Sequence, residues 1–140
     1  MKISQIRQVS LPVTDLQRAI TFYRDVLGAS FTASFDPPGL AFFDFAGVRL
    51  MLSAGEAGSV VYFAVDDIDT AVAEMSIRGV TFDDSPHMIF RDDQGQFGPA
   101  GTEEWMVFFT DTEGNALSLT ERRAISPAGA HEDSASSSEV

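Results

Sequence analysis

The first part of the chain changes from alternating to helical spacing of its apolar residues. Residues 8–13 alternate between apolar and polar or small side chains, and this pattern predicts a strand over about residues 6–13. Apolar positions over residues 16–27 then recur every three or four residues, as on a helix with one buried face. Thr14 or Asp15 can cap the start of this helix, and Gly28 can end it.

Three short apolar segments follow the helix. "SFTASF", "LAFFDF" and "VRLMLS" are separated by the turn sequences "DPPG" and Ala46–Gly47, so they predict three strands joined by hairpins. Together with the first strand and the helix, they form a βαβββ unit over about residues 4–54.

The same pattern returns in the second half of the chain. "SVVYFAVDD" predicts a strand, and a helix over about residues 68–77 follows it with Asp66 or Asp67 as its cap. The apolar segments "VTF", "HMIF", "EWMVFFT" and "ALSL" then complete a second βαβββ unit over about residues 58–121. The extra length of this unit falls in "RDDQGQFGPAGTE", for which a solvated hairpin loop is favoured over a ligand lid.

Composition indicates one folded domain and a polar tail. The chain has 140 residues, of which 44% are hydrophobic and 11% aromatic, enough for a single buried core. Residues 124–140 lose all periodicity and become acidic and rich in Ser and Ala, so we expect a domain over residues 1–123 and a disordered tail.

Charge and cysteine content exclude several classes of function. The formal net charge of −12 opposes binding to nucleic acid or to an anionic membrane surface. The chain has no cysteine, which rules out disulfides, thiolate metal sites and a cysteine nucleophile. It also shows no apolar signal core or membrane-spanning run, so a cytoplasmic location is expected.

Three quoted segments carry a resemblance to a known family. "QVSLPVTDLQRAITFYRDVLG", "VVYFAVDDIDTAVAEMSIRGV" and "FFTDTEGNALSL" resemble the vicinal oxygen chelate superfamily, which includes glyoxalase I, methylmalonyl-CoA epimerase, extradiol dioxygenases and bleomycin-resistance proteins. The resemblance covers about residues 4–121. It implies an α+β fold in which two βαβββ modules pair into a curled mixed sheet around a central cleft, and it implies a homodimer.

The same resemblance bears on metal binding. The superfamily's usual metal ligands fall at Gln8, Met51, Val60 and Ser118, and only Gln8 is a recognised ligand type. A hard divalent cation needs several oxygen or imidazole donors, which a thioether and an isopropyl group do not supply. We therefore predict that the usual metal site is absent and that the protein uses no cofactor.

His87 is the only histidine of the expected domain. If the last two hairpins are symmetric, His87 and Ser118 both lie opposite Val107, which would place His87 in the cleft. A functional histidine and a structural histidine bound by a neighbour are equally compatible with this position.

The same register assigns the faces of the following strand. Glu103 and Trp105 would face the cleft, whereas Met106 and Phe108 would point toward the helices as core. A slip of one residue inverts this assignment, in which case Glu104 replaces Glu103.

Two positions of the first unit complete the expected site. Phe42 lies opposite Met51 and is expected in the cleft. Asp44 and Arg49 face each other across a tight hairpin, and we expect an exposed ion pair that contributes less than ~1 kcal/mol.

Together these features predict a site for a small, partly apolar ligand that is bound without being transformed, as in bleomycin-resistance proteins. Trp105 would stack on the ligand, while Gln8 and His87 would form hydrogen bonds with it. The negative net charge would also attract a cationic metabolite or antibiotic. The expected pocket residues are Gln8, Phe42, Met51, Val60, His87, Trp105 and Ser118.

Two catalytic alternatives remain open. In the first, a metal-independent isomerase or lyase uses His87 as general acid or base with help from Glu103 or Glu104. The second, less favoured, is a metalloenzyme of the glyoxalase or epimerase type.

Overall fold

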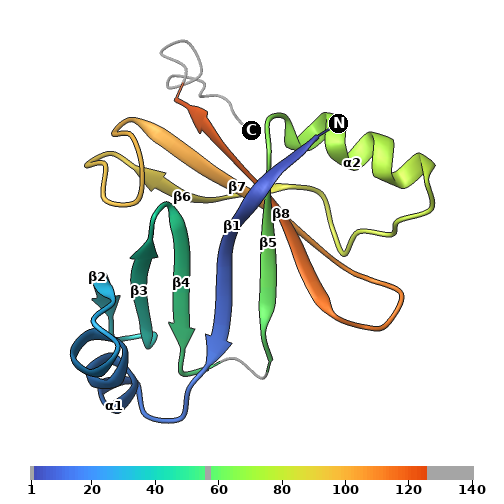
Figure 1. Cartoon of the computed structure of the whole chain (residues 1–140). Helices are drawn as coiled ribbons and strands as arrows, with labels where there is room; N and C mark the ends of the chain where they lie inside the picture. The colour runs from blue at the N-terminus through green and yellow to red at the C-terminus, as the bar shows by residue number, and fades with distance from the viewer. Residues whose placement is uncertain (1, 56–57, 126–140) are drawn as a thin grey trace.

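A computed structural model describes residues 2–55 and 58–125 (Figure 1). Of the tail expected over residues 124–140, Ala124 is the last residue of a strand, and residues 126–140 lie outside the described residues. The first module contains β1 (Ile3–Pro12), α1 (Leu16–Thr21), the π-helical turn η1 (Phe22–Val26), β2 (Ser30–Phe35), β3 (Leu40–Phe45) and β4 (Val48–Ser53). The second module contains β5 (Val60–Val65), α2 (Ile68–Ile77), β6 (His87–Asp92), β7 (Thr102–Thr110) and β8 (Ala116–Ala124).

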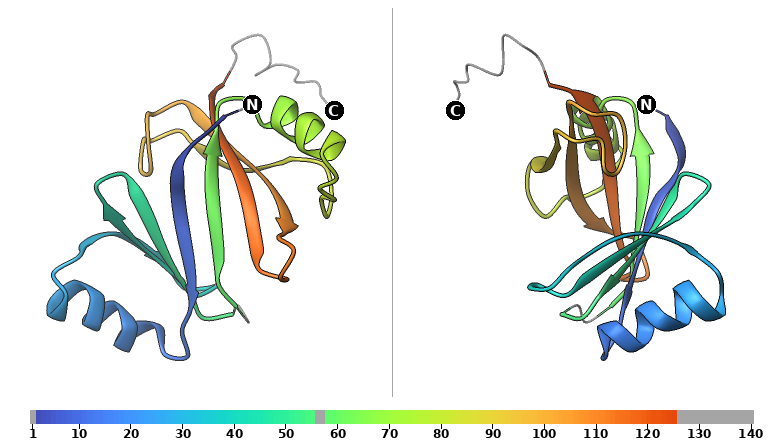
Figure 2. Two further views of the ribbon diagram at one scale, coloured as in Figure 1. Left: turned by 45° about the vertical axis from the view of Figure 1, so that its right-hand side comes forward. Right: turned by 90° about the vertical axis from the view of Figure 1, so that its left-hand side faces the viewer.

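All eight strands belong to one sheet in the order β2-β3-β4-β1-β5-β8-β7-β6. The two modules meet where β1 pairs antiparallel with β5, and within each module the first and last strands pair in parallel. Figure 2 shows that the sheet curls strongly, with α1 and α2 near its opposite ends. The predicted α+β fold of two βαβββ modules is therefore confirmed, although the "VTF" segment contributes only an isolated bridge between Phe82 and Phe109.

Matching aspartates begin the two helices. The Asp15 side chain accepts a hydrogen bond from the Arg18 N–H at 3.0 Å, and the Asp67 side chain accepts one from the Thr70 N–H at 3.2 Å. Each bond satisfies a backbone donor that has no partner within its helix. These caps start the two helices at equivalent places and so fix where each chain segment leaves the sheet.

Alternation along the strands divides the sheet into a core face and an open face. On the core face, Leu16 and Ile20 of α1 pack with Phe43 and Leu52. A second cluster joins α2 with the second module; its buried members are Val65, Ile68, Ala71, Val107, Phe109 and Leu119. Because neighbouring strand residues point to opposite faces, the intervening side chains are left for the concave side of the sheet.

The described part of the chain contains no helix that is long and apolar enough to cross a membrane.

Candidate functional site

The concave face of the sheet holds a cleft of about 460 Å³ to which both modules contribute. Most of its lining is apolar and aromatic, with only four side chains that carry polar groups. The lining residues are Gln8, Phe35, Pro37, Pro38, Leu40, Phe42, Arg49, Met51, Tyr62, Ile89, Phe90, Phe97, Glu104, Met106 and Phe108.

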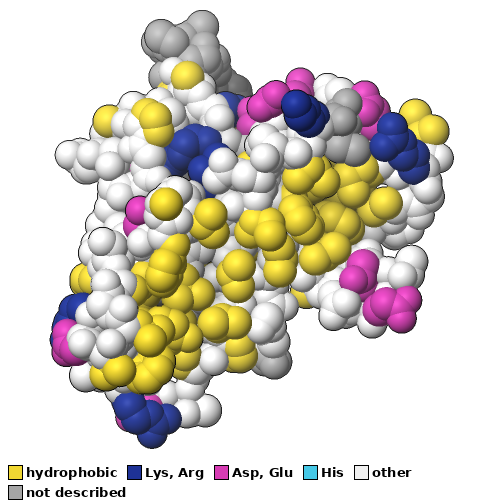
Figure 3. Space-filling view, viewed as in Figure 1, with side chains coloured by type: hydrophobic (Ala, Val, Ile, Leu, Met, Phe, Trp, Pro, Cys, Tyr) yellow, Lys and Arg dark blue, Asp and Glu magenta, His cyan; other side chains and the backbone are white. Residues whose placement is uncertain are grey.

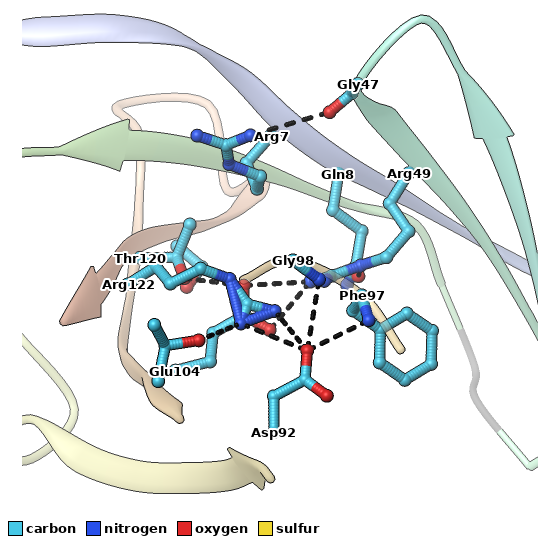
Figure 4. Close-up of polar contacts among 12 residues, drawn as sticks. Arg7, Gln8, Gly47, Arg49, Asp92, Phe97, Gly98, Glu104, Thr120 and Arg122 are labelled. Carbon is cyan, nitrogen blue, oxygen red and sulfur yellow. Dashed lines mark hydrogen bonds and ion pairs between the residues drawn. The ribbon is translucent and has the colours of Figure 1, made fainter. Parts of the chain in front are cut away.

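A buried guanidinium lies at the centre of the polar part of this cleft (Figure 4). Arg49 extends from β4, and its Nε donates a hydrogen bond to Oε1 of Gln8 on the neighbouring strand β1. Its Nη2 donates to both carboxylate oxygens of Glu104 on β7, at 2.9 and 3.0 Å. Only 8% of Arg49, 4% of Glu104 and 2% of Gln8 is exposed. The contact therefore links the two modules across the cleft through a pair of opposite charges.

Burial strengthens the attraction between Arg49 and Glu104, but it also imposes a desolvation cost on both charges. Removing two charges from water costs several kcal/mol per ion, and good geometry with further hydrogen bonds must offset that cost. Gln8 supplies one such bond, and Thr120 Oγ1 lies 3.5 Å from Glu104 Oε2. The result is a cationic donor fixed at one side of a mostly apolar cavity.

The segment between β6 and β7 is anchored by a buried carboxylate. Asp92 is 1% exposed and accepts hydrogen bonds from the backbone N–H groups of Gln96, Phe97 and Gly98 at 2.7 to 3.0 Å. Arg122 on β8 adds an ion pair at 3.0 Å. Burial alone would raise the pKa of Asp92, but the N–H donors and the Arg122 charge outweigh it and hold the pKa below its ordinary value.

This anchor places Phe97 over the cleft. The Phe97 ring lies 4.9 Å from that of Phe42 and 5.3 Å from that of Phe90, measured between ring centroids, and both pairs meet edge to face. The Arg49 guanidinium carbon lies 5.4 Å from the centre of the Phe97 ring, a distance at which a cation is attracted to an aromatic face. The segment is a hairpin loop with much of its length exposed, as expected, but it is not simply solvated, because Asp92 is buried and Phe97 lines the cleft.

Four of the predicted site residues come together in the cleft. Gln8, Phe42 and Met51 line it, with Phe42 paired opposite Met51 as expected. Of the two alternative glutamates, Glu104 is the one that lines the cavity.

The predicted register of the last strands is wrong by one residue. Ser118 pairs with Phe108, and His87 pairs with Met106, so neither lies opposite Val107. The slip turns Met106 and Phe108 toward the cleft and leaves Val107 in the core beneath α2. Since strand side chains alternate with a period of two, this single step exchanges the two faces of β7.

Because the faces of β7 are exchanged, Trp105 and Glu103 do not face the cleft as predicted. Trp105 packs against the second core cluster, and its Nε1–H donates to Glu103 Oε1 at 3.0 Å. The Arg123 guanidinium carbon lies 4.4 Å from the centre of the Trp105 ring. Trp105 is thus held on the helix side of the sheet, where it cannot stack on a ligand in the cleft.

The other three predicted residues also lie outside the cleft lining. His87 is exposed at the start of β6, and its Nε2 lies 3.1 Å from Asp84 Oδ2. Ser118 is fully buried between Tyr62 and Phe108, and its hydroxyl donates to the Leu119 carbonyl at 3.0 Å. Val60 pairs with Ser10 at the beginning of β5.

Sequence reasoning missed Arg49 and Phe97. The expected surface pair of Arg49 with Asp44 is wrong: the two face each other in register, but Arg49 is buried against Glu104, and the Asp44 side chain accepts from the Gly47 N–H. A signal for Arg49 was available, because it stands two residues before Met51 and so shares its face of the strand. Phe97 is placed by the nearby Asp92, which binds its N–H, and by ring contact with the distant Phe42, which no local pattern indicates.

The residues at the family's ligand positions do not fit a divalent metal. The Gln8 carbonyl oxygen already accepts from a guanidinium, whose positive charge would repel a second cation beside it. Met51 and Val60 offer no hard donor, and Ser118 turns its hydroxyl to the backbone. Within residues 2–55 and 58–125, no three His, Asp or Glu side chains group as candidate metal ligands.

The chain is similar to known proteins over most of its length. The model of the Glyoxalase/Bleomycin resistance protein/Dioxygenase superfamily matches residues 5–119. A glyoxylase-like domain-containing protein of Didymella fabae is 29% identical over 130 residues, which cover 84% of this chain and 94% of that protein.

Solved structures repeat the fold at low sequence identity. A hypothetical protein from Bacillus halodurans C-125 superposes with a TM-score of 0.68 at 15% identity, covering 87% of this chain and 96% of its own. A Mn(II)-bound glyoxalase from Novosphingobium aromaticivorans superposes with a TM-score of 0.65 at 18% identity, covering 89% of this chain and 42% of that one.

Proposed function

The chain belongs to the Glyoxalase/Bleomycin resistance protein/Dioxygenase superfamily, and from this premise we propose that its cleft binds a small, partly apolar molecule without transforming it. The observation that carries the proposal is the cleft itself, an apolar cavity of about 460 Å³ with one fixed cationic donor. Concave apolar sites with few directional polar groups are typical of small-molecule binding. This function is similar to that of bleomycin-resistance proteins.

The lining defines the orientation of such a ligand. Its apolar part packs among Phe42, Phe90 and Phe97, whose rings already contact one another. Its polar acceptor, such as a carbonyl or carboxylate oxygen, points toward Arg49 and Gln8. Met51 contributes an adaptable thioether surface at the side of the cavity.

Fluorescence titration with phenylnaphthylamine, an uncharged aromatic probe, tests the proposal. We expect Met51→Trp to fill the cleft and weaken probe binding by about tenfold or more, which corresponds to ~1.4 kcal/mol. Met88→Trp is the matched control, since Met88 is 41% exposed and lies outside the cleft lining. Equal affinity in the wild type and both variants would show that the cleft is not the binding site.

The isomerase or lyase alternative loses its expected base in this geometry. His87 contacts Asp84 outside the cleft, and the carboxylate inside it, Glu104, accepts from Arg49 with both oxygens. Binding without turnover can be distinguished from catalysis by His87 by incubating the wild type and His87→Ala with candidate ligands and following product formation by mass spectrometry. Product formed by the wild type and lost in His87→Ala would overturn binding without turnover.

A metalloenzyme of the glyoxalase or epimerase type receives less support. Its chemistry needs a metal to polarise substrate oxygens, and the four side chains at the ligand positions do not fit one.

A homodimer is part of the proposal. Several large apolar side chains of the first module are exposed, among them Phe22 at 47%, Leu27 at 56% and Val26 at 68%. Figure 3 shows hydrophobic side chains gathered over the region where α1 and β3 lie in Figure 1. Light scattering of wild type, Val26→Asp and the control Ile77→Asp tests this; a dimer lost only in Val26→Asp supports it, and a monomeric wild type contradicts it.

A further inference from the structure

A second cavity of about 310 Å³ adjoins the cleft and has a different character. It shares Arg49 and Phe97 with the cleft, so the two spaces meet at these side chains. The remaining walls come from β1, β2, the end of β3 with its following turn, the loop around Gly98 and β8. The two cavities therefore have one cationic and one aromatic wall residue in common.

Cationic groups concentrate around the second cavity. The whole chain has nine Lys and Arg residues and a net charge of −12, yet Arg7, Arg49 and Arg122 all line this one space. Figure 4 shows the three guanidinium groups with their contacts. Asp44 is the one acidic residue among the described lining residues, and it accepts from the Gly47 N–H.

The three arginines differ in how many of their N–H donors form hydrogen bonds within the protein. Arg49 is bound to Gln8 and Glu104, and Arg122 is bound to Asp92 and Thr102. Within the described part of the chain, Arg7 forms no ion pair and makes one long hydrogen bond, 3.5 Å from its Nη1 to the Gly47 carbonyl oxygen. A guanidinium carries five N–H donors in a planar fork, so Arg7 has donors left for an anion.

We infer that the second cavity binds the anionic group of the same ligand whose apolar part fills the cleft. The ligand class is then an amphipathic anion, with an apolar body and a carboxylate, phosphate or sulfonate. Arg7 supplies the recognising donors, while Arg49 and Arg122, whose guanidinium groups already bind Glu104 and Asp92, complete the lining of the site. The inference rests on the proposed function and adds the charge of the ligand to it.

This charge preference is opposite to the one suggested by net charge alone. The acidic chain as a whole would favour a cation at long range, but that field is screened over roughly 10 Å in salt. Inside the cavity the nearest groups decide, and Arg7 is the arginine whose donors are left for an anion.

Two probes with the same aromatic ring system test the inference. Anilinonaphthalene sulfonate carries one negative charge, whereas phenylnaphthylamine lacks the sulfonate and is uncharged. We expect Arg7→Gln to weaken sulfonate binding by about tenfold, the size of a lost charge-assisted hydrogen bond, and to leave phenylnaphthylamine binding within about twofold. Arg78→Gln is the matched control, because it removes the same charge from an exposed position at the end of α2.

The outcomes separate this inference from the proposed function. If phenylnaphthylamine binding depends on Met51 but the sulfonate probe is insensitive to Arg7→Gln, the anion site is wrong and the cleft proposal stands. If Arg7→Gln and Arg78→Gln lose the same affinity for the sulfonate probe, the loss is explained by the change in net charge, and the anion site is also overturned. If neither probe responds to Met51→Trp in folded protein, both proposals fall, and Leu40→Trp provides a second blocking variant should Met51→Trp fail to fold.

Discussion

The two modules share one plan, but their contributions to the cleft differ. Both begin with a strand, an aspartate-capped helix and a hairpin, and both bury the same face of their sheet beneath a helix. On the open face, the first module supplies the cation Arg49 and the second supplies the anion Glu104. The second module alone adds a long segment, anchored by Asp92, that carries Phe97 across to Phe42 of the first module.

The duplicated modules provide the shape of the cavity but not its chemistry. Repeating the module produces a curved sheet with a cavity at its centre, and this part depends on hydrophobic alternation and helix caps. The chemistry of the cavity comes from positions at which the two copies have diverged. Binding in this protein is therefore expected to depend on positions where the two modules have different residues, rather than on the same residue contributed by each module.

Removing Glu104 should have the largest effect, because it leaves Arg49 buried and unpaired. We expect Glu104→Ala to lower the free energy of unfolding by about 3–5 kcal/mol in urea denaturation. Glu103→Ala is the matched control on the other face of β7. The double variant Arg49→Met/Glu104→Met should recover most of the loss; a Glu104→Ala protein as stable as the control would contradict the pair's role as the link between modules.

Asp92→Asn should have the next largest effect, since one neutral side chain cannot replace a carboxylate that accepts three N–H groups and an arginine. We expect a loss of about 2–3 kcal/mol together with faster hydrogen exchange at the amides of Gln96, Phe97 and Gly98. Asp93→Asn, at an exposed neighbouring position, should change neither quantity. Unchanged exchange at these three amides would mean that the segment is held by something other than Asp92.

Gly98→Ala tests how closely the segment packs on the second module. A Cβ atom at Gly98 would lie 2.4 Å from Nε of Arg122, so the guanidinium must move and its bond with Asp92 must weaken. We expect a loss of about 1–2 kcal/mol and lower affinity for phenylnaphthylamine as Phe97 shifts. Gly55→Ala, where a Cβ atom meets nothing within 4 Å, is the control, and equal effects in the two variants would contradict this packing.

The smallest effect is the pH dependence of the same anchor. Because the pKa of Asp92 lies below its ordinary value of 3.8, its stabilisation is fully present above that value and is lost as pH falls through the lower, folded-state pKa. Below pH 3.8 the free energy of unfolding should therefore fall more steeply for the wild type than for Asp92→Asn. Parallel pH profiles of the two proteins would show that Asp92 is not held ionised by the fold.

Much of the fold could be predicted from local patterns. The spacing of apolar residues gave α2 its bounds, and Asp67 was among the expected caps; the pairing of Phe42 with Met51 followed from a two-residue turn. Each of these depends on residues that are close together in sequence.

The site was less predictable because it depends on register and on distant contacts. The hairpin between β6 and β7 contains an irregularity between Met88 and Phe90, which shifts the pairing of His87 by one residue. The assignments of Trp105, Met106 and Phe108 were reversed at the next hairpin, where Ser118 pairs with Phe108 instead of Val107. The burial of Arg49 depends on Glu104, 55 residues away, which no local pattern encodes.

We propose that the cleft binds a partly apolar ligand beside the buried Arg49–Glu104 pair. A crystal structure of the protein purified without chelator and soaked with phenylnaphthylamine tests it most directly. We expect probe density among Phe42, Phe90 and Phe97, with the Arg49 guanidinium bound to Gln8 and Glu104. A metal ion bonded to Gln8 with Arg49 turned away, or a probe bound only outside the cleft, would contradict it.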